Sequence, residues 1–296
     1  MLRKIIFLSV LFSLMISGCG RDGILPGPGT EVILLPSDLT PAVSPDGKYV
    51  AFFHISIDTT ETTGLYILDL ETGEKTLLLS GEVRNPDFSP DGMWLVFNVG
   101  DQIFKVRLKN DMSGIDSFTL GQLTYEGRNY FPAWSPSGDL IAFSSFRGEI
   151  DRIWLMDSSG NDQRELPLLE KGGVNPDWSP DGMRLVFIGW ADEFSGVVMS
   201  DTLGNEIQYL GGGDDPAWSP DGEWIGYTWS YEMEGGIKLY SVHGDSTVSL
   251  IDMPAMDPAW FPDSRTLVFS ALNPDRTKFV LWKINIDGTG LEQVTY

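Results

Sequence analysis

The sequence predicts an all-β chain, a six-bladed β-propeller built from four-stranded antiparallel blades. A seven-residue phrase, Pro-x-aromatic-Ser-Pro-Asp-Gly in its fullest form, recurs six times, with leading prolines 45, 46, 44, 40 and 42 residues apart. A repeat of about 40–45 residues made of short strands is the period of a propeller blade. The copies are Pro41–Gly47, Pro86–Gly92, Pro132–Gly138, Pro176–Gly182, Pro216–Gly222 and Pro258–Ser264.

The fourth copy shows why each repeat is expected to form four strands. Asn175–Ser179 is the predicted first strand, and the Pro-Asp-Gly after it is turn chemistry, because proline presets φ and glycine accepts a positive φ. Arg184–Ile188 is rich in residues that favour strands and supplies the second. Val197–Asp201 and Glu206–Leu210, separated by a turn, are the third and fourth.

Two aromatic positions in the repeat are predicted to pack one blade on the next. Four antiparallel strands cannot bury both faces alone, and stacking around an axis buries them. Recurrence in nearly every copy favours a core role over a stacking platform for ligands. The positions are Phe88, Trp134, Trp178, Trp218 and Trp260 in the phrase, and Phe52, Phe97, Phe143, Phe187, Tyr227 and Phe269 in the following strand.

Closure of the ring is expected between the first and sixth blades, since terminal repeats are often atypical. The first copy has Val43 in place of an aromatic residue, and the sixth ends in Ser264 in place of glycine. Two segments compete as closing strands, Glu31–Leu35 and Leu291–Tyr296. We expect Glu31–Leu35 to join the sixth blade, as its outermost strand or beside residues 292–296.

The N-terminal residues have the pattern of an export signal. Arg3 and Lys4 precede an apolar run, Ile5–Met15, which is too short to span a bilayer and is typical of a signal-peptide core. Ile16–Cys19 resembles the bacterial lipobox. This resemblance implies cleavage after residue 18 and lipidation of Cys19, and Gly20 at the next position implies the outer membrane. The alternative is an ordinary secretory peptide with an incidental cysteine.

These features divide the chain into a signal peptide (1–18), a Gly/Pro-rich tether (19–30) and a propeller (31–296). Removing residues 1–18 removes two positive charges and changes the net charge from −22 to −24. An acidic chain of this kind repels phosphate backbones, so nucleic acid is excluded as a partner. The acidity fits a basic protein, divalent cations or simple solubility. Cys19 is the only cysteine, so no internal disulfide is possible.

The predicted binding site is the mouth of the central channel, on the face that carries the long, variable loops. Such loops on a rigid frame are where recognition usually occurs. The residue before each leading proline is expected there, together with Arg147 from the loop Ser145–Arg152. The bland alternative is that these residues cap strand ends and hold channel water. The candidates at the mouth are Thr40, Asn85, Phe131, Asn175, Asp215 and Asp257.

The repeated phrase, followed by a strand of the type φ-x-F-x-S and one of the type I-W-x-M-D, resembles the propeller repeats of the TolB family. The third copy is the best match, with Pro132–Gly148 followed by Ile153–Asp157. The resemblance covers residues 31–296. It implies a six-bladed, non-catalytic propeller of the cell envelope that binds a protein partner at the open face of its channel. The chain departs from the family in the short tether before the first blade and in the predicted lipid anchor.

Enzymatic signals are weak in this sequence. It holds no G-x-S-x-G elbow and no EF-hand loop. His54 and His243 are expected on opposite faces, each as a surface or partly packed ring, so they cannot share a metal or a triad. We expect no cofactor and no metal.

Three hypotheses remain. The first, which we favour, is a protein-binding scaffold at the outer membrane. The second is a small-ligand or divalent-cation binder using Asn175, Asp215 and Asp257. The third is a divergent hydrolase.

Overall fold

The computed structural model describes residues 6–7, 32–33, 35–57, 61–167, 169–231 and 234–296. Every regular element in these residues is a β-strand. Cys19 and the whole of the predicted tether lie outside the described residues, as does the predicted signal peptide except for Ile6–Phe7.

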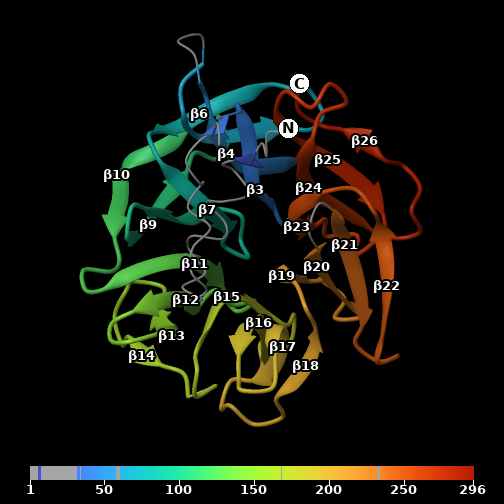
Figure 1. Cartoon of the computed structure of the whole chain (residues 1–296). Coiled ribbons are helices and arrows are strands. Elements are labelled where there is room, and N and C mark those ends of the chain that lie inside the picture. The colour runs from blue at the N-terminus through green and yellow to red at the C-terminus, as the bar shows by residue number, and fades with distance from the viewer. Residues whose placement is uncertain (1–5, 8–31, 34, 58–60, 168, 232–233) are drawn as a thin grey trace.

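The strands form antiparallel sheets arranged in a ring, and the colour in Figure 1 runs around this ring in chain order. Four of the sheets have four strands each, and consecutive strands are neighbours in each of them. We call them the second to fifth units. The second unit consists of β7 (Val83–Phe88), β8 (Trp94–Val99), β9 (Gln102–Leu108) and β10 (Ile115–Gln122), and the third of β11 (Arg128–Trp134), β12 (Leu140–Phe146), β13 (Asp151–Asp157) and β14 (Arg164–Glu165). The fourth unit consists of β15 (Gly173–Trp178), β16 (Arg184–Trp190), β17 (Ser195–Asp201) and β18 (Gln208–Gly211). The fifth consists of β19 (Asp214–Trp218), β20 (Trp224–Tyr231), β21 (Glu234–Ser241) and β22 (Ser246–Ile251).

The remaining large sheet has eight strands and joins the two ends of the chain. One half, the first unit, is β3 (Ser37–Val43), β4 (Tyr49–Ile55), β5 (Gly64–Asp69) and β6 (Lys75–Ser80). The other half, the sixth unit, is β23 (Ala255–Trp260), β24 (Thr266–Leu272), β25 (Phe279–Asn285) and β26 (Glu292–Gln293). A single parallel pair, Phe279 with Ser37, links β25 to β3.

Closure therefore falls between the first and last repeats, but not through the expected segment. The outermost strand of the sixth unit is β26, which pairs with β25. Within the segment Glu31–Leu35 that we expected there, Val32–Ile33 forms β2 and pairs in parallel with β1 (Ile6–Phe7), and Leu35 is in no strand. The contact with β25 begins only at Pro36, whose carbonyl accepts a hydrogen bond from the amide of Phe279. The place at the edge is already filled, so the chain enters β3 directly.

The turns of the repeated phrase, Ser-Pro-Asp-Gly in four of the six copies, connect the first and second strands of each unit as their chemistry predicts. In the fourth copy the Gly182 amide donates to the Ser179 carbonyl at 2.8 Å, and Gly182 has φ +70°. The Ser179 hydroxyl donates to the Asp181 carboxylate at 2.6 Å and accepts from the Arg184 amide at 2.9 Å. The turn is thus closed by its own side chains, which leaves both strands in register.

Hydrophobic cores lie between neighbouring units, and both predicted aromatic positions are buried in them. Side chains of the second-strand position are at most 2% exposed, and those of the phrase position at most 8%. One cluster joins Ile67 of the first unit to Phe88 of the second, and another joins Leu155 of the third unit to Trp178 of the fourth. Packing from unit to unit around the ring confirms the predicted core role. It also fixes the inner strands rigidly around the central opening.

Candidate functional site

The inner ends of the first strands surround a channel of about 260 Å³. The residue before each leading proline lines this channel in all six repeats, and so does the proline after it. The structure thus brings together the six residues that the sequence analysis placed at the channel mouth, which are Thr40, Asn85, Phe131, Asn175, Asp215 and Asp257.

A shared backbone conformation aims these residues at the channel. All six have a left-handed φ, between +48° and +56°. Each first strand is irregular at this point, as in the register shift between Arg84 and Asp87. Asn and Asp tolerate a left-handed φ best, whereas a β-branched or bulky residue there is strained. Thr40 and Phe131 are the two strained members of the ring.

Hydrogen bonds run from repeat to repeat around the channel wall. The Thr40 amide donates to Asp257 Oδ2 at 3.1 Å, across the junction of the first and sixth units. Thr40 Oγ1 in turn accepts from the Asn85 amide at 3.3 Å. On the other side, Asn175 Nδ2 donates to Asp215 Oδ1 at 3.1 Å. These side chains therefore have a structural role, because their hydrogen bonds connect one repeat to another along the wall of the channel.

Phe131 interrupts this pattern because its side chain can accept nothing. The Asn175 amide donates instead to Ser144 Oγ at 2.8 Å. The Phe131 ring lies edge-on to Tyr130, with 5.4 Å between the ring centroids. Phe131 thus places a partly exposed apolar surface in a wall that is otherwise polar.

Two further aspartates line the channel, and the sequence reasoning missed them. Asp87 and Asp177 follow the leading prolines of the second and fourth copies, where four other copies have alanine. Asp87 Oδ2 accepts from the backbone amide of Trp134 at 2.7 Å, and Asp177 Oδ2 accepts from that of Trp218 at 2.6 Å. The sequence could have indicated these two residues, because the second and fourth copies are the ones with a charged residue directly after the leading proline.

Where alanine takes that place, the next tryptophan is held differently. The indole Nε1 of Trp178 donates to the Ala133 carbonyl at 3.2 Å, and Trp260 does the same to Ala217 at 3.0 Å. The repeats therefore use two ways to attach the next unit. One of them places a carboxylate inside the channel.

The channel carboxylates have raised pKa values because they are withdrawn from water. Burial raises the pKa of Asp87 to about 7, and the nearby charge of Asp177 adds to this. Burial also raises the pKa of Asp177 to about 6 and that of Asp257 to about 6. For Asp215, burial and then the charges of Asp257 and Asp214 raise the pKa well above its ordinary value. Among the described residues that line the channel, none is a lysine or an arginine.

Arg147 lies apart from this group. It is not among the residues that line the channel. Its guanidinium carbon lies 4.2 Å from the ring centroid of Trp154, and Nε donates to Ser145 Oγ at 3.0 Å. Its Nη2 donates to Asn129 and Gln163. Arg147 thus connects the loop after β12 to strands β11, β12 and β13 and to Gln163, all within the third unit.

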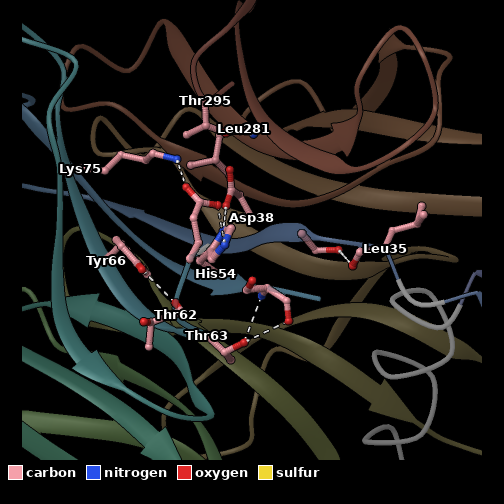
Figure 2. Close-up of polar contacts among 12 residues, drawn as sticks. Leu35, Asp38, His54, Thr62, Thr63, Tyr66, Lys75, Leu281 and Thr295 are labelled. Carbon is pink, nitrogen blue, oxygen red and sulfur yellow. Dashed lines mark hydrogen bonds and ion pairs between the residues drawn. The ribbon is translucent and has the colours of Figure 1, made fainter. Parts of the chain in front are cut away.

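His54 is more buried than the sequence suggested. It is 6% exposed and sits at the end of β4, where Nδ1 lies 2.7 Å from Asp38 Oδ1 and Nε2 lies 3.2 Å from Glu61 Oε2. Lys75 Nζ approaches the other oxygen of Glu61 at 3.4 Å, and Figure 2 shows these groups converging beside Tyr66. The cluster connects the β4–β5 loop to β3, the strand that pairs with β25 where the ring closes. His243 lies in the turn after β21, where it is exposed and 3.5 Å from Glu223.

Within the described part of the chain, no group of three or more His, Cys, Asp or Glu side chains has the arrangement of a metal site. None of the described residues forms a long apolar helix of the kind that crosses a membrane.

Comparison with known proteins gives a family and a fold. The TolB beta propeller domain family matches residues 31–262. An uncharacterized protein of Agrobacterium fabrum (strain C58 / ATCC 33970) is 34% identical over 137 residues. That match covers 42% of this chain and 44% of the relative, so the chain aligns with less than half of the relative's length.

Solved structures share the fold at low sequence identity. TolB from Acinetobacter baumannii is 23% identical with a TM-score of 0.64, over 76% of this chain and 57% of that one. Oligogalacturonate lyase from Vibrio parahaemolyticus is 13% identical with a TM-score of 0.60, over 88% of this chain and 78% of that one. The same architecture thus occurs both in a TolB protein and in an enzyme.

Proposed function

Since this chain belongs to the TolB β-propeller domain family, we propose that it is a six-bladed, non-catalytic propeller of the cell envelope that binds a protein partner at the open face of its channel. The six repeats of the phrase and the six four-stranded units support a count of six blades. The propeller would span residues 31–296. The TolB relationship favours an exported protein.

Attachment to the membrane is the second part of the proposal. The lipobox-like Ile16–Cys19 supports lipidation of Cys19, with residues 19–30 as a tether on the periplasmic side of the outer membrane. Incorporation of labelled palmitate into the wild-type chain, and its loss in Cys19→Ser, is the expected result. Labelling of the Cys19→Ser chain would contradict the anchor, and so would an unlabelled wild-type chain.

One observation carries the binding proposal: four aspartates with raised pKa values share a narrow channel whose described lining has no basic side chain. A positive group entering the channel would stabilise their charged forms. A volume of about 260 Å³ suits one or two side chains of a partner rather than a folded domain. The expected partner therefore presents a segment with a lysine or arginine, and Phe131 offers the apolar contact beside it.

Site-specific photo-crosslinking in cells tests this proposal. A photoreactive residue in place of Phe131 is expected to give one defined adduct with a single protein. A matched probe at Met183, which is 68% exposed on the tight-turn side, is expected to give none. Asp87→Asn combined with Asp177→Asn removes two charges but keeps the acceptors for the tryptophan amides. This pair is expected to weaken the adduct at residue 131.

An absent adduct at residue 131, or equal adducts at residues 131 and 183, would overturn the proposal. A divalent cation is the competing occupant, using Asn175, Asp215 and Asp257. It predicts a rise in unfolding temperature with calcium that is lost in Asp215→Asn with Asp257→Asn. A hydrolase would instead require turnover that depends on channel residues.

A further inference from the structure

A second cavity, of about 540 Å³, opens between the second and third units on the side of the tight turns. It shares no lining residue with the central channel. Its volume lies within the usual range of small-molecule sites. The lining residues that matter here are Asp91, Trp94, Lys105, Trp134, Ser137 and Ser158.

The cavity exists because one position of the repeat has changed its character. Lys105 on β9 pairs with Val96, the residue before the buried aromatic Phe97. Four other units have an apolar side chain at this register, and each is buried in the cluster that faces the next unit. These are Ile67, Leu155, Met199 and Leu239. A lysine cannot fill this space as they do, so a cavity remains on the tight-turn side of the junction, beside the cluster that joins Val96 of the second unit to Ile141 of the third.

Lys105 has donors to spare. Its ammonium group donates to the Ser158 carbonyl and lies 4.8 Å from the ring centroid of Trp94. An ammonium has three donors, and this contact uses one. Among the described residues, no carboxylate lies within ion-pairing distance of Lys105. Lys283, at the same register in the sixth unit, is paired with Glu292 at 3.0 Å.

Asp157 is the acidic residue whose charge acts on Lys105, and its carboxylate already accepts hydrogen bonds from other groups. Asp157 Oδ1 accepts from the amides of Ser159 and Asn161, each at 2.8 Å. Burial lowers the pKa of Lys105, which is the cost of holding an ammonium without a close counter-ion. An anionic group in the cavity would remove that cost.

A second departure from the repeat lies on the facing wall. The third copy of the phrase has Ser137 where the others have aspartate. Its hydroxyl lies 3.2 Å from Ser135 Oγ and is neutral. The carboxylate that remains at the cavity, Asp91, accepts from Ser89 Oγ at 2.5 Å and from the Met93 amide at 2.9 Å. Both changes favour an anion, one by adding a positive charge and the other by removing a negative one.

We propose that this cavity binds a small sugar acid. The carboxylate would pair with the Lys105 ammonium, since charge-assisted hydrogen bonds to carboxylates are the strong ones. The Ser137 hydroxyl and the indole walls of Trp94 and Trp134 suit the hydroxyls and the apolar face of a sugar ring. This site is independent of the channel and of its partner.

The test is a titration of the full-length ¹⁵N-labelled chain, followed through the indole N–H signals of Trp94 and Trp134. Glucuronate is expected to shift both signals. Glucose, its neutral counterpart, and acetate, which lacks the ring, are each expected to bind about tenfold more weakly or worse. Lys105→Met is expected to lose about tenfold in glucuronate affinity. Lys109→Met, a lysine in the turn after the same strand, is expected to bind as the wild type does.

Lys105→Met has a precedent in the chain, because Met199 occupies the same register in the fourth unit and is buried. It should therefore fold, and thermal unfolding checks this. Unmoved Trp94 and Trp134 signals in glucuronate would overturn the proposal. So would equal affinity for glucose, or undiminished affinity in a folded Lys105→Met chain.

Discussion

Asp181 lies in the Pro-Asp-Gly turn that follows a first strand, and Asp87 lies in the channel near the end of another first strand, yet their pKa values move in opposite directions. In the turns, the hydrogen bond from Ser179 lowers the pKa of Asp181. In the channel, burial raises the pKa of Asp87 to about 7. Hydrogen bonds from neighbouring residues thus stabilise the charged form of Asp181, and this carboxylate stabilises the turn. Withdrawal from water makes a channel carboxylate a source of instability that a ligand could relieve.

The largest expected effect is on the pH dependence of stability. Asp87, Asp177 and Asp257 have folded pKa values of about 7, 6 and 6, against 3.8 for an ordinary aspartate. Between these limits the folded chain holds protons that the unfolded chain releases, so the free energy of unfolding falls as pH rises. We expect a loss on the order of 5 kcal/mol from pH 5 to pH 8.

Two aspartates in turns, Asp181 and Asp287, act in the opposite sense and at lower pH. Hydrogen bonds from Ser179 and Thr289 hold their pKa values below 3.8, so their contribution to stability is lost as pH falls through 3.8 and below. Urea unfolding from pH 3 to pH 8 should therefore show a maximum at about pH 4–5. A stability that keeps rising from pH 5 to pH 8 would show that the channel carboxylates are not destabilised.

Asp87→Asn is expected to stabilise the chain at pH 8 by about 4 kcal/mol. The amide oxygen can still accept from the Trp134 amide, and the charge that burial disfavours is gone. Chemical unfolding at pH 8 measures the gain, and the same pair compared at pH 4 serves as the control, because there the wild-type carboxyl is already protonated. A destabilised Asp87→Asn chain at pH 8 contradicts the comparison.

The identical substitution in a turn is expected to have the opposite sign. Asp181→Asn weakens the charge-assisted bonds from the Ser179 hydroxyl and the Met183 amide, at a cost of about 1 kcal/mol at pH 7. Equilibrium unfolding of both variants side by side gives the difference directly. If both changes shift stability in the same direction, the two regions do not differ as described.

The smallest effect concerns the channel backbone. Thr40 has φ +49° and is β-branched, so Thr40→Asn is expected to relieve strain and add about 0.5 kcal/mol of stability. Asparagine can keep an acceptor for the Asn85 amide. Thr40→Val loses that acceptor and keeps the branching, so it should be destabilised. A loss of stability in Thr40→Asn as large as that in Thr40→Val would rule out strain at this position.

Much of the fold follows from the sequence because its signals are local and repeated. Proline and glycine determine the turns, and the aromatic residues that recur at the positions of Phe143 and Trp178 have to be buried. The positions before the leading prolines were predictable for the same reason, since a strand order repeated around an axis brings equivalent positions together.

The rest depends on contacts between units, which one repeat does not reveal. Whether Asp87 and Asp177 are withdrawn from water depends on how narrowly the ring closes. The cavity at Lys105 depends on what the next unit presents to it. His54 is buried partly because Glu61, from the loop after β4, contacts its ring. At the edge of the sixth unit, β26 pairs with β25 in the place where Glu31–Leu35 was the other candidate strand.

The most direct test is the carboxyl titration of Asp87, followed by NMR in a chain with ¹³C-labelled aspartate and assigned by comparison with Asp87→Asn. We predict a midpoint near 7 for Asp87 and one below 3.8 for Asp181 in the same sample. A midpoint for Asp87 at or below 3.8, alongside the turn carboxylates, would contradict the account of the channel.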